Sequence, residues 1–431
     1  MSHDRRQFLF RSAAAGLGTS LALRAAEQAT LPPGAPPQPP GRPHVDYRPV
    51  VTPNGASLPF RIVDGVKVFW LIVEPVRHEF APGLEGNCWG YNGRVHGPTI
   101  EAVEGDRVRI YVTNKIDAPT TVHWHGLYVP NGMDGVGGLT QRSIEPGETF
   151  RYEFTLRQHG TFMYHSHHDE MVQMAMGLMG MIVVHPRSPT EPLPDRDFVY
   201  MLSEWSLPVG AQRPDPNEMA DFNVLTFNGK VFPATAPMVV KTGQRVRIRI
   251  GNLSAMDHHP IHLHGHSFQV IETDGGQVPA PARWPETTVL VATGSTRTVE
   301  FIADAPGDWA MHCHMTHHVM TQMGHGIPNL VGVDPSMFDE KLAKVMPAFV
   351  EMGQEVQRDP MAEDDTLPKN SVPMQGGMGG FGYITMGGMV TTLKVRDVLA
   401  SFDDPGFYVH PPGTVADVAA AAELERDGIG E

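Results

Sequence analysis

The chain has 431 residues, including 45 Gly and 39 Pro, and a formal net charge of −15 at pH 7. Its length allows two or three domains, and the Gly and Pro content is typical of a turn-rich β protein. The negative charge argues against nucleic acid or an anionic membrane surface as a partner, because phosphates would be repelled. No apolar run after the N-terminal region is long enough to span a bilayer.

The N-terminus carries RRQFLF at residues 5–10, followed by an apolar stretch of small residues at 13–23. This pattern is typical of a twin-arginine export signal, and we predict a signal peptide over residues 1–29. We therefore expect a periplasmic or exported protein. The Pro-rich residues 30–49 lack the donors for a regular hydrogen-bond ladder and predict an extended linker.

An internal repeat organises the rest of the chain. GDRVRIYVTN at 105–114 recurs as GQRVRIRIGN at 243–252, and each is a turn followed by an alternating strand. A His-x-His pair follows each copy, and a Gly-led strand ending in a second His-x-His pair follows later in both. The repeat predicts two similar β-sandwich domains, at residues 50–186 and 198–335. Residues 336–431 are expected to form a helical and Met/Gly-rich C-terminal tail.

The segment around Cys313 carries the most specific chemistry. Successive side chains of a strand point to opposite faces, so His312 and His314 share one face while Cys313 points to the other. On the Cys313 side, His318 and Met323 add an imidazole and a thioether, which is the ligand set of a blue-copper site short of one histidine. The other cysteine, Cys88, has no such partners, so we expect a buried packing thiol and no disulfide framework.

The first domain lacks the residues for a blue-copper site. Ser166 stands where Cys313 stands in the second copy, and Met171 stands where His318 stands. Each domain still provides two His-x-His pairs, so eight imidazoles can converge if the domain faces meet. Eight neutral nitrogens suit three coppers with open positions for an oxygen ligand.

Four motifs together resemble the copper motifs of the multicopper oxidases: HWHG at 123–126, HSH at 165–167, HPIHLHG at 259–265 and the segment around Cys313. The resemblance spans both domains and implies cupredoxin-like, Greek-key β-sandwiches in an all-β fold. It implies four coppers per functional unit. The type 1 copper would be held by His259, Cys313, His318 and Met323, the type 2 copper by His123 and His262, and the type 3 pair by His125, His165, His167, His264, His312 and His314.

Only about ninety residues separate His167 from His259, whereas three-domain laccases place a whole extra domain between the corresponding histidines. The chain therefore resembles the two-domain, small-laccase type, in which the first domain of one chain and the second domain of its neighbour complete the cluster. This resemblance implies a homotrimer with copper clusters between the subunits. Heterologous contacts that close on themselves make such rings.

Proton delivery is expected to involve Asp134, which matches an aspartate of the family that lies near the three-copper cluster. The alternative is a turn-forming Asp-Gly pair. Many family members carry a second acid three residues after the cysteine, where this chain has Thr316. The acid of this second position is therefore replaced by a residue that does not ionise in the same range.

We expect a laccase-like oxidase that couples four one-electron oxidations of a phenolic, aromatic or metal-ion donor to the reduction of dioxygen to water. A copper nitrite reductase is one alternative, although its pattern places the blue-copper cysteine in the first domain. A non-catalytic periplasmic copper-binding or tolerance protein is another. A copper-binding role would explain the methionine runs at 163–181 and 374–389, because thioethers bind Cu(I) well. For the first run, packing in the core is the competing interpretation.

Overall fold

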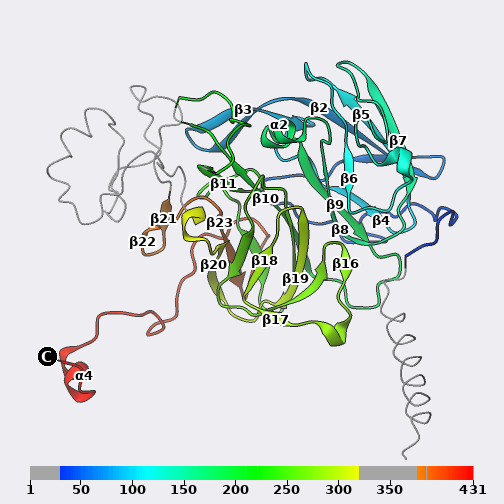
Figure 1. The fold of residues 1–431 in the computed structure, drawn as a ribbon. Helices are drawn as coiled ribbons and strands as arrows, with labels where there is room; N and C mark the ends of the chain where they lie inside the picture. The colour runs from blue at the N-terminus through cyan, green and yellow to red at the C-terminus, as the bar shows by residue number, and fades with distance from the viewer. Residues whose placement is uncertain (1–29, 209, 221, 320–375, 385, 431) are drawn as a thin grey trace, which may run out of the picture.

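The structure is a computed structural model that describes residues 30–319 and 376–430, apart from residues 209, 221 and 385. Two β-sandwiches form the body of the molecule (Figure 1), which confirms the all-β, cupredoxin-like class. Within the described residues the α-helices are α2 (Glu170–Ala175) and α4 (Ala421–Arg426). The predicted signal peptide, the helical part of the predicted tail and Met323 lie outside the described residues.

The first sandwich pairs a five-stranded sheet with a four-stranded sheet. One sheet contains β1 (Phe60–Val63), β2 (Val66–Ala81), β3 (Leu84–Tyr91), β5 (Arg107–Asn114) and β7 (Thr149–Thr155). The other contains β4 (Ile100–Val103), β9 (Met179–His185), β8 (Gly160–His165) and β6 (His123–His125), in that order. Alternate residues of β5 are buried and half-buried, as expected when one face of a strand packs on the core.

The second sandwich repeats this plan with a larger, seven-stranded sheet. That sheet contains β11 (Val224–Phe227), β10 (Arg196–Trp205), β13 (Arg245–Asn252), β19 (Ser295–Ile302), β15 (Phe268–Thr273), β16 (Gly276–Gln277) and β17 (Pro285–Glu286). The facing sheet has the order β12 (Met238–Lys241), β23 (Val390–Arg396), β20 (Gly307–Cys313), β14 (His259–Leu263) and β18 (Thr288–Val291). The repeat seen in the sequence is thus a repeat of β5, β6 and β8 as β13, β14 and β20.

Strand β23 comes from the predicted tail but belongs to the second sandwich. It pairs antiparallel with β20 and parallel with β12, and so fills the gap between them. Its apolar residues Val390, Leu393 and Val395 are almost completely buried in the core. Part of the predicted tail is therefore an integral strand, next to the strand that carries Cys313. The remaining described tail includes the hairpin of β21 (Gly377–Gly379) and β22 (Gly382–Ile384).

The two sandwiches meet along a buried layer that is rich in methionine. Met163, Met179 and Met181 of the first domain pack with Val199 and Met201 of β10. Gly251 on β13 allows this contact, because a Cβ there would lie only 2.7 Å from the Met181 sulfur. These methionines of the first run pack in the core. Cys88 is likewise a buried free thiol in an apolar cluster.

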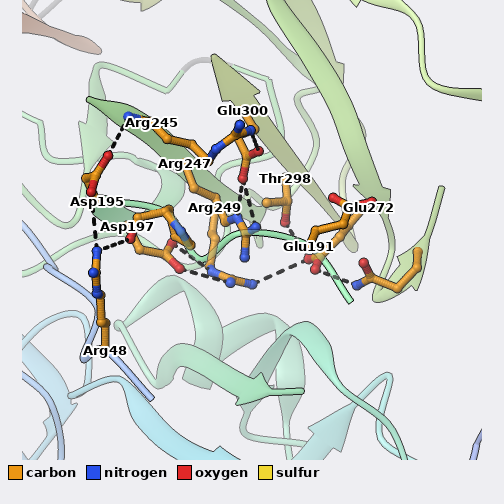
Figure 2. Close-up of polar contacts among 12 residues, drawn as sticks. Arg48, Glu191, Asp195, Asp197, Arg245, Arg247, Arg249, Glu272, Thr298 and Glu300 are labelled. Atoms are coloured by element: carbon orange, nitrogen blue, oxygen red, sulfur yellow. Dashed lines mark hydrogen bonds and ion pairs between the residues drawn. The ribbon is translucent and has the colours of Figure 1, made fainter. Parts of the chain in front are cut away.

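A buried ion network crosses the same interface (Figure 2). The Arg249 guanidinium donates to both Asp197 carboxylate oxygens, at 2.9 and 3.0 Å, and to Thr161 Oγ1 of the first domain at 2.8 Å. Thr161 in turn donates to Glu272 Oε2 at 3.0 Å. Two carboxylates and two domains therefore depend on one buried guanidinium, and removing it would leave buried charge unpaired. No helix in the described part of the chain is long and apolar enough to cross a membrane.

Candidate metal centres

A compact buried site forms where β14 begins, where β20 ends and in the 3-10 helix η3 (Thr316–Val319). The Cys313 sulfur lies 3.4 Å from His318 Nδ1 and 3.7 Å from His259 Nδ1. The two Nδ1 atoms are 3.1 Å apart, and all three side chains are buried. The three residues that the sequence assigns to one centre thus converge on one point.

The outer nitrogen of each imidazole has a polar partner of its own. His259 Nε2 lies 2.7 Å from Ser254 Oγ, and His318 Nε2 lies 3.3 Å from Asp257 Oδ2. Such partners fix the orientation of a ligand ring, and here they keep each Nδ1 directed at Cys313. The motifs alone do not single out Ser254 and Asp257, although both lie within five residues of His259.

Burial determines the protonation states at this site. Burial raises the pKa of the Cys313 thiol to about 12 and lowers the pKa of His259 to about 3. The imidazole is therefore neutral and ready to ligate, whereas the thiol needs a nearby cation to become a thiolate. One thiolate and two imidazoles are a donor set that fits copper. The sulfur and one nitrogen of each imidazole lie within 4.8 Å of one another, close enough to bind one ion.

The equivalent position in the first domain is closed by hydrogen bonds. Gln173 Oε1 accepts from Thr120 Oγ1 at 2.7 Å and from Ser166 Oγ at 2.5 Å, and the Gln173 side chain is buried. Met171, which stands at the repeat position that His318 has in the second domain, is exposed. Gln173 therefore occupies the space that a metal would need, and the sequence offset alone could not show this.

Four histidines gather at the end of the first sandwich. His123 lies directly opposite His165 in the pairing of β6 with β8, and His125 and His167 complete the group, which we call the first quartet. Cross-strand neighbours are close enough for their side chains to meet. Five of the ring pairs in this quartet have centroids 5.4–6.0 Å apart.

The second sandwich builds the same arrangement. His262 lies opposite His312 in the pairing of β14 with β20, and His264 and His314 complete the second quartet. The five equivalent ring pairs have centroids 4.7–5.7 Å apart. The internal repeat therefore extends from the sequence to the relative placement of the rings.

Backbone carbonyls fix the tautomers of equivalent histidines in both quartets. Four rings donate from Nδ1 to a carbonyl 2.8 Å away: His123 to Asp134, His165 to Ser166, His262 to Thr287 and His312 to Cys313. A carbonyl only accepts, so each Nδ1 carries the proton and each Nε2 keeps its lone pair. Four Nε2 atoms are thus available to bind a metal.

Each quartet is open on one side. His264 and His314 are exposed, and His123 and His167 are half-buried. In the part of the chain that the structure describes, no ring contact joins a histidine of the first quartet to one of the second. All eight predicted histidines therefore form two groups of four, and a single chain does not bring the two groups together.

Two carboxylates border the first quartet. The Asp134 carboxylate lies 3.5 Å from His123 Nδ1 and is about one-third exposed. Glu170, at the start of α2, lies 3.6 Å from His165 Nδ1 and 3.8 Å from His167 Nε2. Asp134 is the acid that the sequence singles out, whereas Glu170 belongs to no recognised motif and is found only from the structure.

A cupredoxin-like pair of domains, one with a buried Cys–His₂ site and each with a histidine quartet, defines a class of copper protein. Comparison with known proteins specifies the family. Two sequence models of the multicopper oxidases match residues 73–189 and 208–331, which together make up more than half of the chain. The chain belongs to the multicopper oxidase family.

Individual relatives agree with this assignment. Copper resistance protein A of Pseudomonas syringae pv. tomato is 29% identical over 52% of this chain and 44% of its own length. Laccase-2 of Cryptococcus neoformans var. grubii is 33% identical over 46% of this chain and 38% of its own. The chain thus spans less than half the length of these curated relatives. The solved structure of the multicopper oxidase mgLAC superposes with a TM-score of 0.58 at 27% identity, over 78% of this chain and 87% of that one.

Proposed function

We propose that the protein is a laccase-like oxidase that couples four one-electron oxidations of a donor to the reduction of dioxygen to water. The observation that carries this proposal is the pair of matching histidine quartets, one of which includes both backbone neighbours of the buried Cys313. A simple copper-storage protein has no need for that linkage. Bound copper would supply reversible one-electron chemistry and a binding place for dioxygen.

The ligand assignment follows the motifs. We propose that His259, Cys313, His318 and Met323 would hold the type 1 copper and that His123 and His262 would hold the type 2 copper. The remaining six histidines would hold the type 3 pair: His125, His165, His167, His264, His312 and His314. His312 Nδ1 also donates to the Cys313 carbonyl, so covalent bonds and a hydrogen bond both connect the two kinds of site.

We further propose a cyclic homotrimer in which the first quartet of one chain faces the second quartet of the next. The open sides of both quartets and the lack of contact between them in one chain support this arrangement. A ring of three heterologous contacts closes without leaving a free quartet. Light scattering on copper-loaded protein tests it, and an active, fully loaded monomer would contradict it.

Asp134 is proposed to deliver protons at the cluster. Its carboxylate lies 3.5 Å from His123 Nδ1 and reaches solvent, so it can take up a proton outside and hold it beside the quartet. The His123 ring keeps its Nδ1 proton and donates it in a hydrogen bond to the Asp134 carbonyl, 2.8 Å away. The side chain is therefore free for proton transfer, while the backbone of the same residue positions the ligand.

The donor is proposed as a phenolic, aromatic or low-valent metal species. Met256, three residues before His259, and Met315, two residues after Cys313, are both exposed, and the Asp257 carboxylate lies 3.3 Å from His318 Nε2. Thioethers bind Cu(I) well, so this surface favours a cuprous ion among the metal donors. Export to the periplasm is proposed from the twin-arginine pattern at residues 5–10.

The stoichiometry of dioxygen consumption tests the proposal directly. Copper-loaded protein should consume one dioxygen for four one-electron donors oxidised, without releasing peroxide. Copper binding without dioxygen consumption would favour the sequestering protein instead. A nitrite reductase is disfavoured because the first-domain position for its blue-copper site is filled by Gln173.

A further inference from the structure

The C-terminal twenty described residues, 411–430, form an arm that leaves the body of the molecule (Figure 1). Every residue of the arm is exposed. The figure shows the chain running out from the second sandwich to α4, which lies far from both sandwiches. No residue of the arm, among those that the structure describes, is buried against the two sandwiches.

The residues just before the arm are held firmly. Lys394 Nζ donates to Asp404 Oδ1 at 2.5 Å, and Arg396 Nη2 donates to the Gly406 carbonyl at 2.7 Å. The Tyr408 amide donates to Asp308 Oδ2 at 2.8 Å. The arm therefore starts a few residues after a segment that is attached to β20 and β23.

Within the described residues, the hydrogen bonds of the arm are all internal. Thr414 Oγ1 donates to the Pro411 carbonyl at 2.7 Å, and the Ala420 amide donates to Glu423 Oε2 at 3.0 Å at the start of α4. A six-residue helix is not stable alone in water, because nucleation costs more than so few hydrogen bonds return. The arm needs a surface to pack against.

The amino-acid composition of the arm indicates which kind of surface it can pack against. Val415, Val418, Leu424 and Ile429 are exposed by 43%, 93%, 38% and 63%, which is apolar area available for burial. The same segment carries four carboxylates and one cation, Arg426. A nucleic acid or an anionic membrane would repel it. The apolar side chains fit a protein surface.

We propose that this arm docks on the body of a second copy of the chain and holds neighbouring subunits together. The inference rests on the ring proposed above, in which each first quartet needs the second domain of another copy. Residues 411–420 can extend over about 35 Å, which is enough to pass a subunit boundary and place α4 on the neighbour. In a closed ring each subunit gives one arm and receives one.

The test compares the copper-loaded full chain with two variants by native mass spectrometry and by light scattering during dilution. One variant ends at His410, and the other is the full chain with Val418→Asp and Ile429→Asp. Both should fold and show the blue colour, since every described residue of the arm is exposed and the hydrogen bonds described above for the arm are internal. We expect at least a tenfold rise in the dissociation constant of the oligomer for each variant, and no change for the control Val45→Asp, which adds a charge at an exposed valine outside the arm.

A photo-cross-linker at position 418, in oligomers mixed from light and heavy isotope-labelled chains, identifies the acceptor. Cross-links that join light to heavy peptides are expected. Two results would overturn the proposed role of the arm and leave the proposed trimer intact: a truncated chain that forms the trimer as tightly as the full chain, and a full chain whose cross-links all lie inside one chain. A full chain that is monomeric when loaded and active would overturn both.

Discussion

Cys313 and Cys88 are both buried, but only Cys313 has imidazole nitrogens within 3.7 Å of its sulfur. We expect Cys313→Ser to abolish the blue absorption and to remove one copper per chain, because a hydroxyl does not replace a thiolate in this site. The other coppers should remain. Cys88→Ser is the matched control and should change neither, so loss of colour in that variant would contradict the assignment. Absorption spectra with metal analysis decide the question.

Asp134 is expected to affect proton supply and not copper binding. Asp134→Ala should keep the blue colour, since the Asp134 carbonyl still accepts from His123, but should slow dioxygen reduction by about tenfold to a hundredfold. Stopped-flow reoxidation of the reduced protein measures this rate. Asp117→Ala removes another exposed acid away from the quartets and is the control. A wild-type rate in Asp134→Ala would refute the role.

Four buried histidines predict a pH-dependent stability for the metal-free protein. Burial lowers the pKa of His96, His165 and His259 to about 3 and that of His78 to about 4. Between these values and the ordinary pKa of about 6.5, the unfolded chain binds protons that the folded chain does not. The free energy of unfolding should therefore fall as the pH falls, by up to about 1.4 kcal/mol per pH unit for each histidine.

Urea denaturation of metal-free protein at pH 7 and pH 5 measures this effect. His410→Gln is the control, because His410 is exposed and should leave the slope unchanged. Equal stability at the two pH values would show that these histidines are not buried in their neutral form.

At the residue level the sequence indicates the candidate ligands but not the residues that surround them. Strand alternation and two matching repeats are local patterns. They suffice to place His312 and His314 on one face of the strand and Cys313 on the other. Gln173 and Glu170 act through contacts made only after folding. No motif marks a glutamine that fills a metal position, so the closed first-domain position had to come from the structure.

At the level of elements, β23 determines how far the chain can be shortened. Truncation after Pro335 would remove a strand that pairs with both β20 and β12. We expect this variant to lose the second sandwich and with it the Cys313 site, whereas a chain that ends at His410 should keep both. Circular dichroism and copper content test the pair. A folded, copper-loaded chain ending at Pro335 would contradict the role of β23.

The repeat predicts β5, β6 and β8 and their partners β13, β14 and β20, because these strands carry clear turns and alternation. Strand β23 is missed for two reasons. It follows a Gly/Met-rich stretch that favours irregular structure, and it is buried on nearly all residues, so it lacks a two-residue alternation. Its partner β20 also lies about eighty residues away in sequence, a distance over which local patterns give no information.

At the level of the whole molecule, the relative placement of the domains is set by groups that the sequence does not connect. The buried contact of Arg249 with Asp197 and Thr161 joins strands from both sandwiches. Together with the methionine layer, it fixes where each quartet opens. The sequence indicates that eight histidines belong together, while the fold shows that one chain keeps them in two groups of four.

The open quartets have a practical consequence for handling the protein. A separate metal-free chain has two clusters of four imidazoles with ring centres only 4.7–6.0 Å apart, and every ring except His165 is at least partly exposed. Such clusters behave as built-in affinity tags, so an isolated chain should be retained on an immobilised-nickel resin without any added tag. In the proposed trimer every quartet would face another, so the copper-loaded trimer should pass through the resin. Retention on the resin would then report, fraction by fraction, how much of a preparation has assembled.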